Sequence, residues 1–180
     1  MIAGDAERSC RRGVAALNAG DAEEAARWFE RAITVDRQRG MKRPRPRFVS
    51  FYGLALALAG KSRREAVQAC ELALARDSFD PKLHLNLARV FLLFQRTTRA
   101  LEVLERGLKL HPGNVALSNL LRRADRRQPP TFPSLSRDHL LNRSLGRMRA
   151  TFRKPRTDKR WVAQHRLEGV EEVNSYSTSR

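Results

Sequence analysis

The residues of this sequence that could perform acid–base, nucleophilic or metal chemistry are spread along the chain. Neither cysteine, Cys10 or Cys70, has a histidine nearby at the spacing of a metal site. The acidic pairs Glu23-Glu24 and Glu171-Glu172 would diverge on a helix, and the sequence has no glycine-rich phosphate loop. We therefore predict a chain that is not an enzyme and uses neither a metal nor a cofactor. The scattered histidines are His84, His111, His139 and His165.

One polar stripe has the spacing of a binding site. Lys82, Asn86 and Arg89 are separated by four and three residues, so on a helix they share one face. Two cations with an amide between them could clamp a carboxylate or another acidic group. The alternative is a solvated polar stripe on an exposed helix, and the sequence leaves both interpretations open.

The overall charge indicates an anionic partner. The 180 residues carry a formal net charge of +17, and 30 of the 36 basic side chains are arginine. The planar guanidinium of arginine can donate two parallel hydrogen bonds to one phosphate or carboxylate. Nucleic acid, an acidic protein surface or an acidic membrane face would fit this balance. The densest basic run could contact phosphates or could be a solvated connection. It holds Arg37, Arg39, Lys42, Arg43, Arg45 and Arg47.

Helical periodicity runs through the first two thirds of the chain. Small residues recur seven apart with a larger residue between them, as in Ala25, Phe29 and Ala32, which makes one helical stripe. Pro44 and Pro46 forbid a continuous helix after the first two helical segments. The pattern predicts seven helices, over about residues 5–19, 22–35, 47–59, 62–76, 81–94, 97–110 and 114–126.

The same stripe returns twice, at Ala66 and Ala73 and again at Ala100 and Gly107. Ala66 and Ala100 are 34 residues apart, which is the tetratricopeptide period. Ala25 and Ala66 are 41 residues apart, so an insertion separates the first two units. Over about residues 6–123 the sequence resembles the tetratricopeptide repeat family.

This resemblance implies an all-α fold, a right-handed α-solenoid of three helix-turn-helix repeats with a capping helix. The array is expected over residues 5–126, and an extended, partly helical basic tail over 127–180. The repeats would fall at about 6–36, 46–79 and 81–112, with the cap at 114–126.

The sequence departs from the family pattern at three turn positions. Arg37 and Ser78 stand where a proline usually closes a repeat, and Gln95 replaces a turn glycine. The segments 45–53 and 129–147 are also similar to a set of bacterial tetratricopeptide proteins with a basic tail after the array.

In the family, the first helix of each repeat lines a concave face on which partner peptides lie. Some members hold a partner's C-terminal carboxylate there with Lys and Asn side chains. The matching first-repeat positions are Cys10 and Val14, so that clamp is not expected, and a peptide of mixed apolar and acidic character fits better. Carried over by pattern, the partner-binding residues are Arg11, Val14, Ser50, Leu54, Lys82, Asn86 and Arg89.

The tail carries a second basic surface. Pro129 and Pro130 open an extended linker, and a short helix is predicted over about 136–153, with an apolar stripe from Leu141 to Phe152. Such a helix docks on the array, binds a partner or lies on an anionic membrane. Its cations, further candidates for anion binding, are Arg143, Arg147, Arg149 and Arg153.

Two functions remain open. The first is a non-catalytic scaffold or adaptor that holds an acidic segment of a partner protein on the concave repeat face. The second is a basic accessory subunit that contacts RNA, the ribosome or DNA phosphates through the 37–47 insertion and the tail. The first residues do not form a secretory signal, and no apolar run is long enough for a membrane span. We therefore expect the protein in the cytoplasm.

Overall fold

The computed structural model describes residues 3–125, which form seven α-helices and no strand. Short turns join the first six helices into three pairs, and the seventh helix packs on the last pair. The predicted all-α solenoid of three repeats with a capping helix is therefore confirmed. The helices are α1 (Ala3–Ala19), α2 (Ala22–Gln38), α3 (Pro46–Leu58), α4 (Arg63–Arg76), α5 (Pro81–Leu93), α6 (Thr97–Leu110) and α7 (Val115–Ala124).

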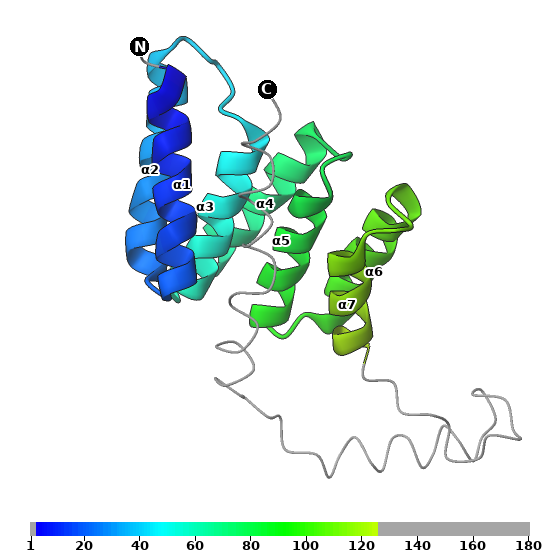
Figure 1. Cartoon of the computed structure of the whole chain (residues 1–180). Helices are drawn as coiled ribbons and strands as arrows, with labels where there is room; N and C mark the ends of the chain where they lie inside the picture. The colour runs from blue at the N-terminus through cyan, green and yellow to red at the C-terminus, as the bar shows by residue number, and fades with distance from the viewer. Residues whose placement is uncertain (1–2, 126–180) are drawn as a thin grey trace, which may run out of the picture.

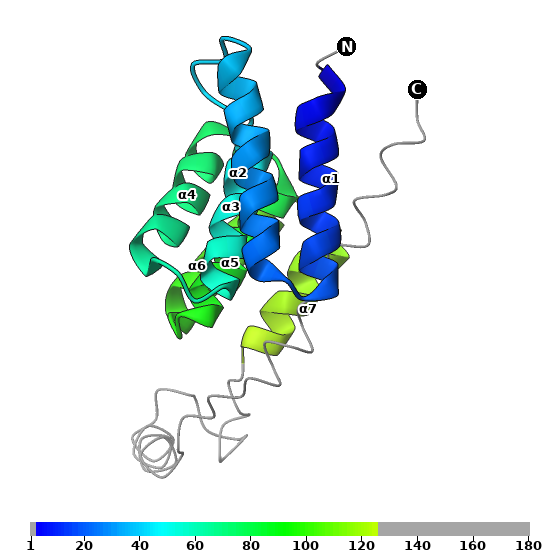
Figure 2. The same ribbon diagram turned by 90° about the vertical axis from the view of Figure 1, so that its left-hand side faces the viewer.

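The helices form two layers (Figures 1 and 2). One layer contains α1, α3, α5 and α7, and the other contains α2, α4 and α6. Across pairs, α3 packs on α2 and α5, while α5 also packs on α4 and α7. Because neither helix of a pair can bury its apolar side alone, this stacking creates one continuous core. We call the outer side of α1, α3 and α5 the first-helix face.

Side-chain caps set where α2, α4 and α7 begin. Asp21, Ser62 and Asn114 each accept a hydrogen bond from the backbone N–H three residues on, at 2.8, 3.3 and 2.9 Å. Pro46 and Pro81 occupy the first turns of α3 and α5, where the missing N–H would have no helical partner in any case. These local signals explain why the predicted helix starts lie close to the observed ones.

The turns inside the three pairs share one backbone conformation. Gly20 and Gly60 have φ angles of 85° and 69°, and Gln95 has a φ of 60° at the corresponding place in the third pair. The left-handed conformation costs a residue with a Cβ about 1–2 kcal/mol. The missing turn glycine of the third repeat therefore changes the energy of the turn and leaves its geometry unchanged.

Close helix approach depends on residues without a side chain at the crossings. A Cβ on Gly13 would lie 2.8 Å from the Phe29 ring, and one on Gly53 would lie 2.7 Å from the Cys70 sulfur and the Ala66 carbonyl oxygen. The first two repeats then meet through Phe29 and Phe51, whose rings stack with centroids 5.3 Å apart. This packing joins the first two helix pairs through α2 and α3.

The second predicted helix was too short. It was expected to end near Val35, but α2 continues to Gln38 and includes Asp36, which is fully buried. A buried carboxylate needs a charged or hydrogen-bonding partner, and that partner comes from the insertion after α2.

Candidate functional site

A buried hydrogen bond marks the seam between α3 and α5. Asn86 Nδ2 donates to Ser50 Oγ at 3.1 Å, and both side chains are buried. Leu54, one turn after Ser50, is also buried. The sequence predicted these three residues as partner contacts. The structure instead places them in the packing between two helices, where the amide and the hydroxyl satisfy each other.

Three predicted partner contacts keep exposed surface. Arg11 on α1 is exposed, and Lys82 and Arg89 on α5 are partly exposed. Asn86 lies between Lys82 and Arg89 on the same stripe and faces α3, so these two cations border the α3–α5 seam, one turn to either side of Asn86. The remaining predicted contact, Val14, is buried.

Arg45 is held inside the insertion and is not presented to a ligand. Its Nε donates to Asp36 Oδ2 at 3.1 Å, a terminal nitrogen donates to Asp36 Oδ1 at 2.9 Å, and its backbone N–H donates to Asp36 Oδ2 at 3.0 Å. The other terminal nitrogen pairs with Glu7 on α1. The prediction of Arg45 as an anion-binding cation is contradicted, because two carboxylates of the chain already share its guanidinium.

The same pairing controls the ionisation of Asp36. Burial alone would raise the pKa of this carboxyl, but the hydrogen bonds and charge of Arg45 outweigh burial and hold the pKa below its usual range. Asp36 therefore stays charged at neutral pH, and its ion pair with Arg45 persists.

The end of the insertion that leads into α3 is anchored to its neighbours as well. Arg76 on α4 donates to the carbonyl oxygens of Pro44 and Arg43. Arg47 is partly buried, and its guanidinium lies 6.0 Å from the centre of the Phe51 ring. The other predicted cations of the insertion are the exposed Arg37, Lys42 and Arg43 and the partly buried Arg39.

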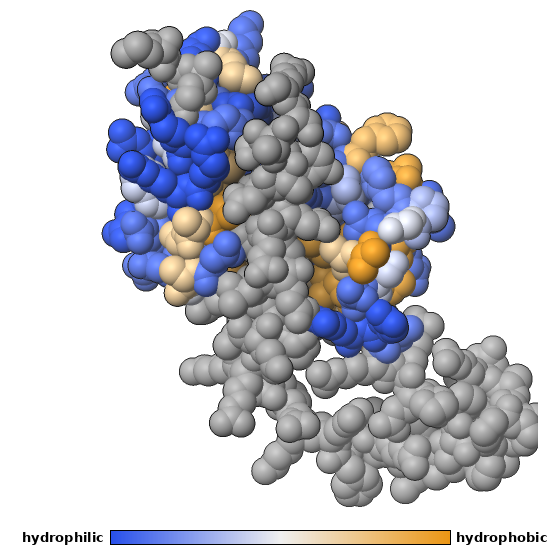
Figure 3. Space-filling model, viewed as in Figure 1, coloured by the Kyte–Doolittle hydropathy of each residue, from blue (hydrophilic) through white to orange (hydrophobic). Residues whose placement is uncertain are grey.

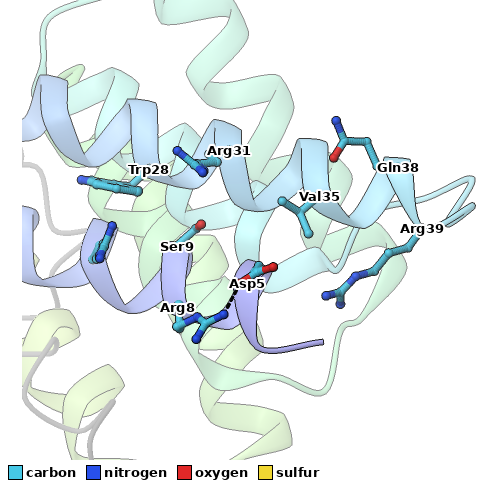
Figure 4. A pocket seen from close by; sticks show the side chains of 9 residues that line it. Asp5, Arg8, Ser9, Trp28, Arg31, Val35, Gln38 and Arg39 are labelled. Atoms are coloured by element: carbon cyan, nitrogen blue, oxygen red, sulfur yellow. Dashed lines mark hydrogen bonds and ion pairs between the residues drawn. The ribbon is translucent and has the colours of Figure 1, made fainter. Parts of the chain in front are cut away.

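A cavity of about 500 Å³ opens between α1 and α2 (Figure 4). The sequence pattern did not indicate this cavity. Of its lining residues, only Arg39 was among the predicted site residues, and it was predicted as part of the insertion. Hydrophilic side chains gather over this part of the molecule (Figure 3). We call the cavity the α1/α2 pocket. The residues of its lining used below are Asp5, Arg8, Ser9, Arg12, Trp28 and Arg31.

Trp28 positions two guanidinium groups in the α1/α2 pocket. The Cζ atoms of Arg12 on α1 and Arg31 on α2 lie 4.7 and 5.8 Å from the ring centre. The indole N–H donates to Glu24 at 3.1 Å, which fixes the ring. Within residues 3–125, neither Arg12 nor Arg31 forms an ion pair.

The one carboxylate of the lining belongs to Asp5, and Arg8 pairs with it. The pKa of the Asp5 carboxyl is lowered, mainly by the hydrogen bond from Arg8 and further by the charges of Arg39 and Arg31. The pocket thus holds four arginines against a single aspartate, and its field is positive.

Two of the four histidines form hydrogen bonds to the turn between α4 and α5. His84 Nε2 donates to the Ser78 carbonyl oxygen at 2.9 Å, and His111 Nε2 donates to the Phe79 carbonyl oxygen at 2.6 Å. Both rings therefore hold the turn between α4 and α5. Their separation of 27 residues hid this relation from sequence reasoning.

The described part of the chain contains no cluster of three or more His, Cys, Asp or Glu residues able to hold a metal ion. Cys10 and Cys70 are buried free thiols, and burial raises their pKa values to about 11 and about 12. Among the seven helices, none is long and apolar enough to cross a membrane. The predicted helix over 136–153, with Arg143, Arg147, Arg149 and Arg153, lies outside the described residues.

The stacked helix pairs with small residues at their crossings define a helical repeat protein. A tetratricopeptide repeat family model matches residues 10–81 and 56–115, which together cover more than half of the chain. The chain belongs to the tetratricopeptide repeat family, whose members are generally protein-interaction modules.

Solved structures of tetratricopeptide domains share this fold. The first such domain of Spaghetti (RPAP3), bound to the HSP90 peptide SRMEEVD, has a TM-score of 0.55 and 21% identity, over 67% of this chain and 93% of that one. The Sgt2 domain from Aspergillus fumigatus has a TM-score of 0.56 and 19% identity, over 67% and 77%. The second domain of human RPAP3, in complex with the HSP70 peptide SGPTIEEVD, has a TM-score of 0.54 and 20% identity, over 69% and 98%. No curated protein sequence matches the chain.

Proposed function

We propose that this protein is a non-catalytic scaffold or adaptor that binds an acidic, partly apolar segment of a partner protein on the first-helix face. One observation carries the proposal: Lys82 and Arg89 border the α3–α5 seam with part of their surface exposed. Arg11 on α1 is exposed, and by the family pattern it would add a third cation to the same face. A segment laid across α1, α3 and α5 would meet positive charge on α1 and on α5.

The comparisons support this choice of ligand class. The peptides in two of the similar domains, SRMEEVD and SGPTIEEVD, both contain adjacent glutamates. This chain has Cys10 and Val14, both buried, where a clamp for a C-terminal carboxylate would need Lys and Asn. We therefore expect an internal acidic segment and not a free chain end.

The test selects a phage-displayed peptide library on the full chain. Enriched peptides should carry Asp or Glu among apolar residues. The double variant Lys82→Glu, Arg89→Glu should lose these peptides. The matched variant Arg64→Glu, Lys109→Glu reverses two exposed charges on α4 and α6 and should keep them. Equal binding by both double variants, or enrichment of peptides without acidic residues, would refute the proposal.

A random-sequence oligonucleotide tests the alternative of a nucleic-acid subunit. Phosphate binding weakens steeply between about 50 and 200 mM salt. Tight oligonucleotide binding with this salt dependence, lost on Arg37→Glu and Arg43→Glu, would favour the accessory-subunit function. The structure lends that alternative less support, because Arg45, at the end of the insertion next to α3, is already neutralised.

A further inference from the structure

The α1/α2 pocket has features that the first-helix face lacks. It is a concave site of about 500 Å³, within the range of small-ligand pockets. Its cations come from two helices, whereas Lys82 and Arg89 share one. In the later repeats the first helix packs on the preceding pair, but α1 has no preceding pair within the described residues. All of the residues that line the pocket come from α1, α2 and the residue directly after α2.

Arg12 and Arg31 are the recognition elements of this pocket. Both arginines are exposed, and the cation–π contacts with the Trp28 ring restrain their guanidiniums, so binding a ligand costs less side-chain entropy than it would with unrestrained arginines. Two like charges held at one ring repel each other, and within residues 3–125 neither forms an ion pair, although the charge of Arg31 acts on Asp5. An anion bound by both would relieve that repulsion.

The number and shape of the donors select among anions. A guanidinium fork binds two oxygens of a phosphate or a carboxylate. A carboxylate has only two oxygens and one negative charge, so it can satisfy one fork. A phosphate monoester has three terminal oxygens and a charge of about −1.5 to −2 at neutral pH, which matches two forks. The buried Ser9 on the α1 wall adds a hydroxyl to the lining.

We propose that the α1/α2 pocket binds the phosphoryl group of a phosphate monoester, with Arg12 and Arg31 as the main donors. The monoester is carried by a phosphorylated side chain of a partner protein or by a small phosphorylated molecule. This site is separate from the first-helix face, so the two proposals stand or fall independently.

The experiment titrates the full chain by calorimetry at constant ionic strength. The probes are a pentapeptide with a central phosphoserine, the same peptide with glutamate, glycerol phosphate, and a short phosphodiester oligonucleotide. The phosphoserine peptide should bind about tenfold or more tightly than the glutamate peptide. Glycerol phosphate that binds as tightly as the phosphopeptide identifies a small molecule as the source, and weaker binding identifies a protein. Either result supports the site.

Variants locate the binding. Arg12→Gln and Arg31→Gln, singly and together, should each weaken phosphopeptide binding by about tenfold. Arg27→Gln removes the same charge from an exposed position of α2 outside the pocket and should bind like the parent. Because the chain has 2 tryptophans, Trp161→Phe leaves Trp28 as the single fluorescent reporter, which should respond saturably to the phosphopeptide.

Three results would overturn the proposal. The first is the absence of saturable binding by either monoester. The second is equal weakening by Arg27→Gln and by the pocket variants, which would mean a diffuse charge effect. The third is a phosphodiester oligonucleotide that binds more tightly than the monoesters and loses affinity with Arg12→Gln and Arg31→Gln, which would make the pocket part of a nucleic-acid surface.

Discussion

Replacing Arg45 by methionine should destabilise the array more than any other loss of a single charge in the insertion. Arg45 donates two side-chain hydrogen bonds to the fully buried Asp36 and pairs with Glu7. Methionine keeps an adaptable apolar stem against Phe48, whose ring lies 4.2 Å from the guanidinium carbon. The change therefore removes charge and hydrogen bonds while it leaves most of the volume filled.

Two limits set the magnitude of the effect. Removal of one partner of a buried ion pair costs about 3–5 kcal/mol, and the low end applies because the Arg45 side chain is 32% exposed. In the variant, the Asp36 carboxylate can also lose its unpaired charge by binding a proton. Protonating a carboxyl with the ordinary pKa of 3.8 at neutral pH costs about 4 kcal/mol, at about 1.36 kcal/mol for each pH unit. We expect the free energy of unfolding to fall by about 3–4 kcal/mol.

The assay is urea unfolding followed by circular dichroism, because urea does not screen ion pairs. Arg43→Met removes a charge from an exposed place in the same insertion and should change stability by less than about 0.5 kcal/mol. Asp36→Asn combined with Arg45→Met removes both charges and should recover much of the loss. Equal effects of Arg45→Met and Arg43→Met would refute the reasoning, as would a double variant no more stable than Arg45→Met.

Three further predictions follow from ionisation and backbone geometry. The destabilisation by Arg45→Met should shrink as the pH falls below about 3.8 in urea melts, because the lowered folded-state pKa of its partner carboxyl gives stability that acid removes. In urea melts, Gln95→Gly should raise the free energy of unfolding by up to about 1 kcal/mol, while Gly60→Ala should lower it by about 1 kcal/mol. If both variants changed the free energy of unfolding in the same direction, the shared left-handed turn conformation would be contradicted. At about pH 8, Cys10 and Cys70 should react with a thiol reagent only as fast as the chain opens, because burial raises their pKa values to about 11 and about 12; immediate reaction of the native protein would disprove this.

Local signals explain why the helices and repeats could be predicted from the sequence. Period, small residues at crossings, caps and prolines act within a few residues of one another, so their effect on the backbone shows in the pattern. The end of α2 was missed because Asp36 stays in the helix through a partner nine residues later, beyond Pro44. No helical pattern indicates such a contact.

The candidate site was harder to predict, because it depends on how helices approach each other. The pattern placed Ser50 and Asn86 on the first helices of their repeats, but only the spacing of α3 and α5 decides that they meet and are buried. In the same way, Arg8 and Arg12 are one turn apart on α1, and Trp28 and Arg31 are one turn apart on α2. These four residues form a pocket only because α1 and α2 are oriented so that their side chains face the same space.

Because Asp36 pairs with Arg45, the packing of the helices does not depend on how many residues the insertion contains. The ion pair joins the two ends of the insertion, while Glu7 and Arg76 tie it to α1 and α4. Residues between these ends can increase in number without moving α2 against α3, because a longer closed loop costs only a slowly growing entropy. The tip around Gly40 and Met41 is therefore a place where a sequence can be inserted while the helix stack stays intact.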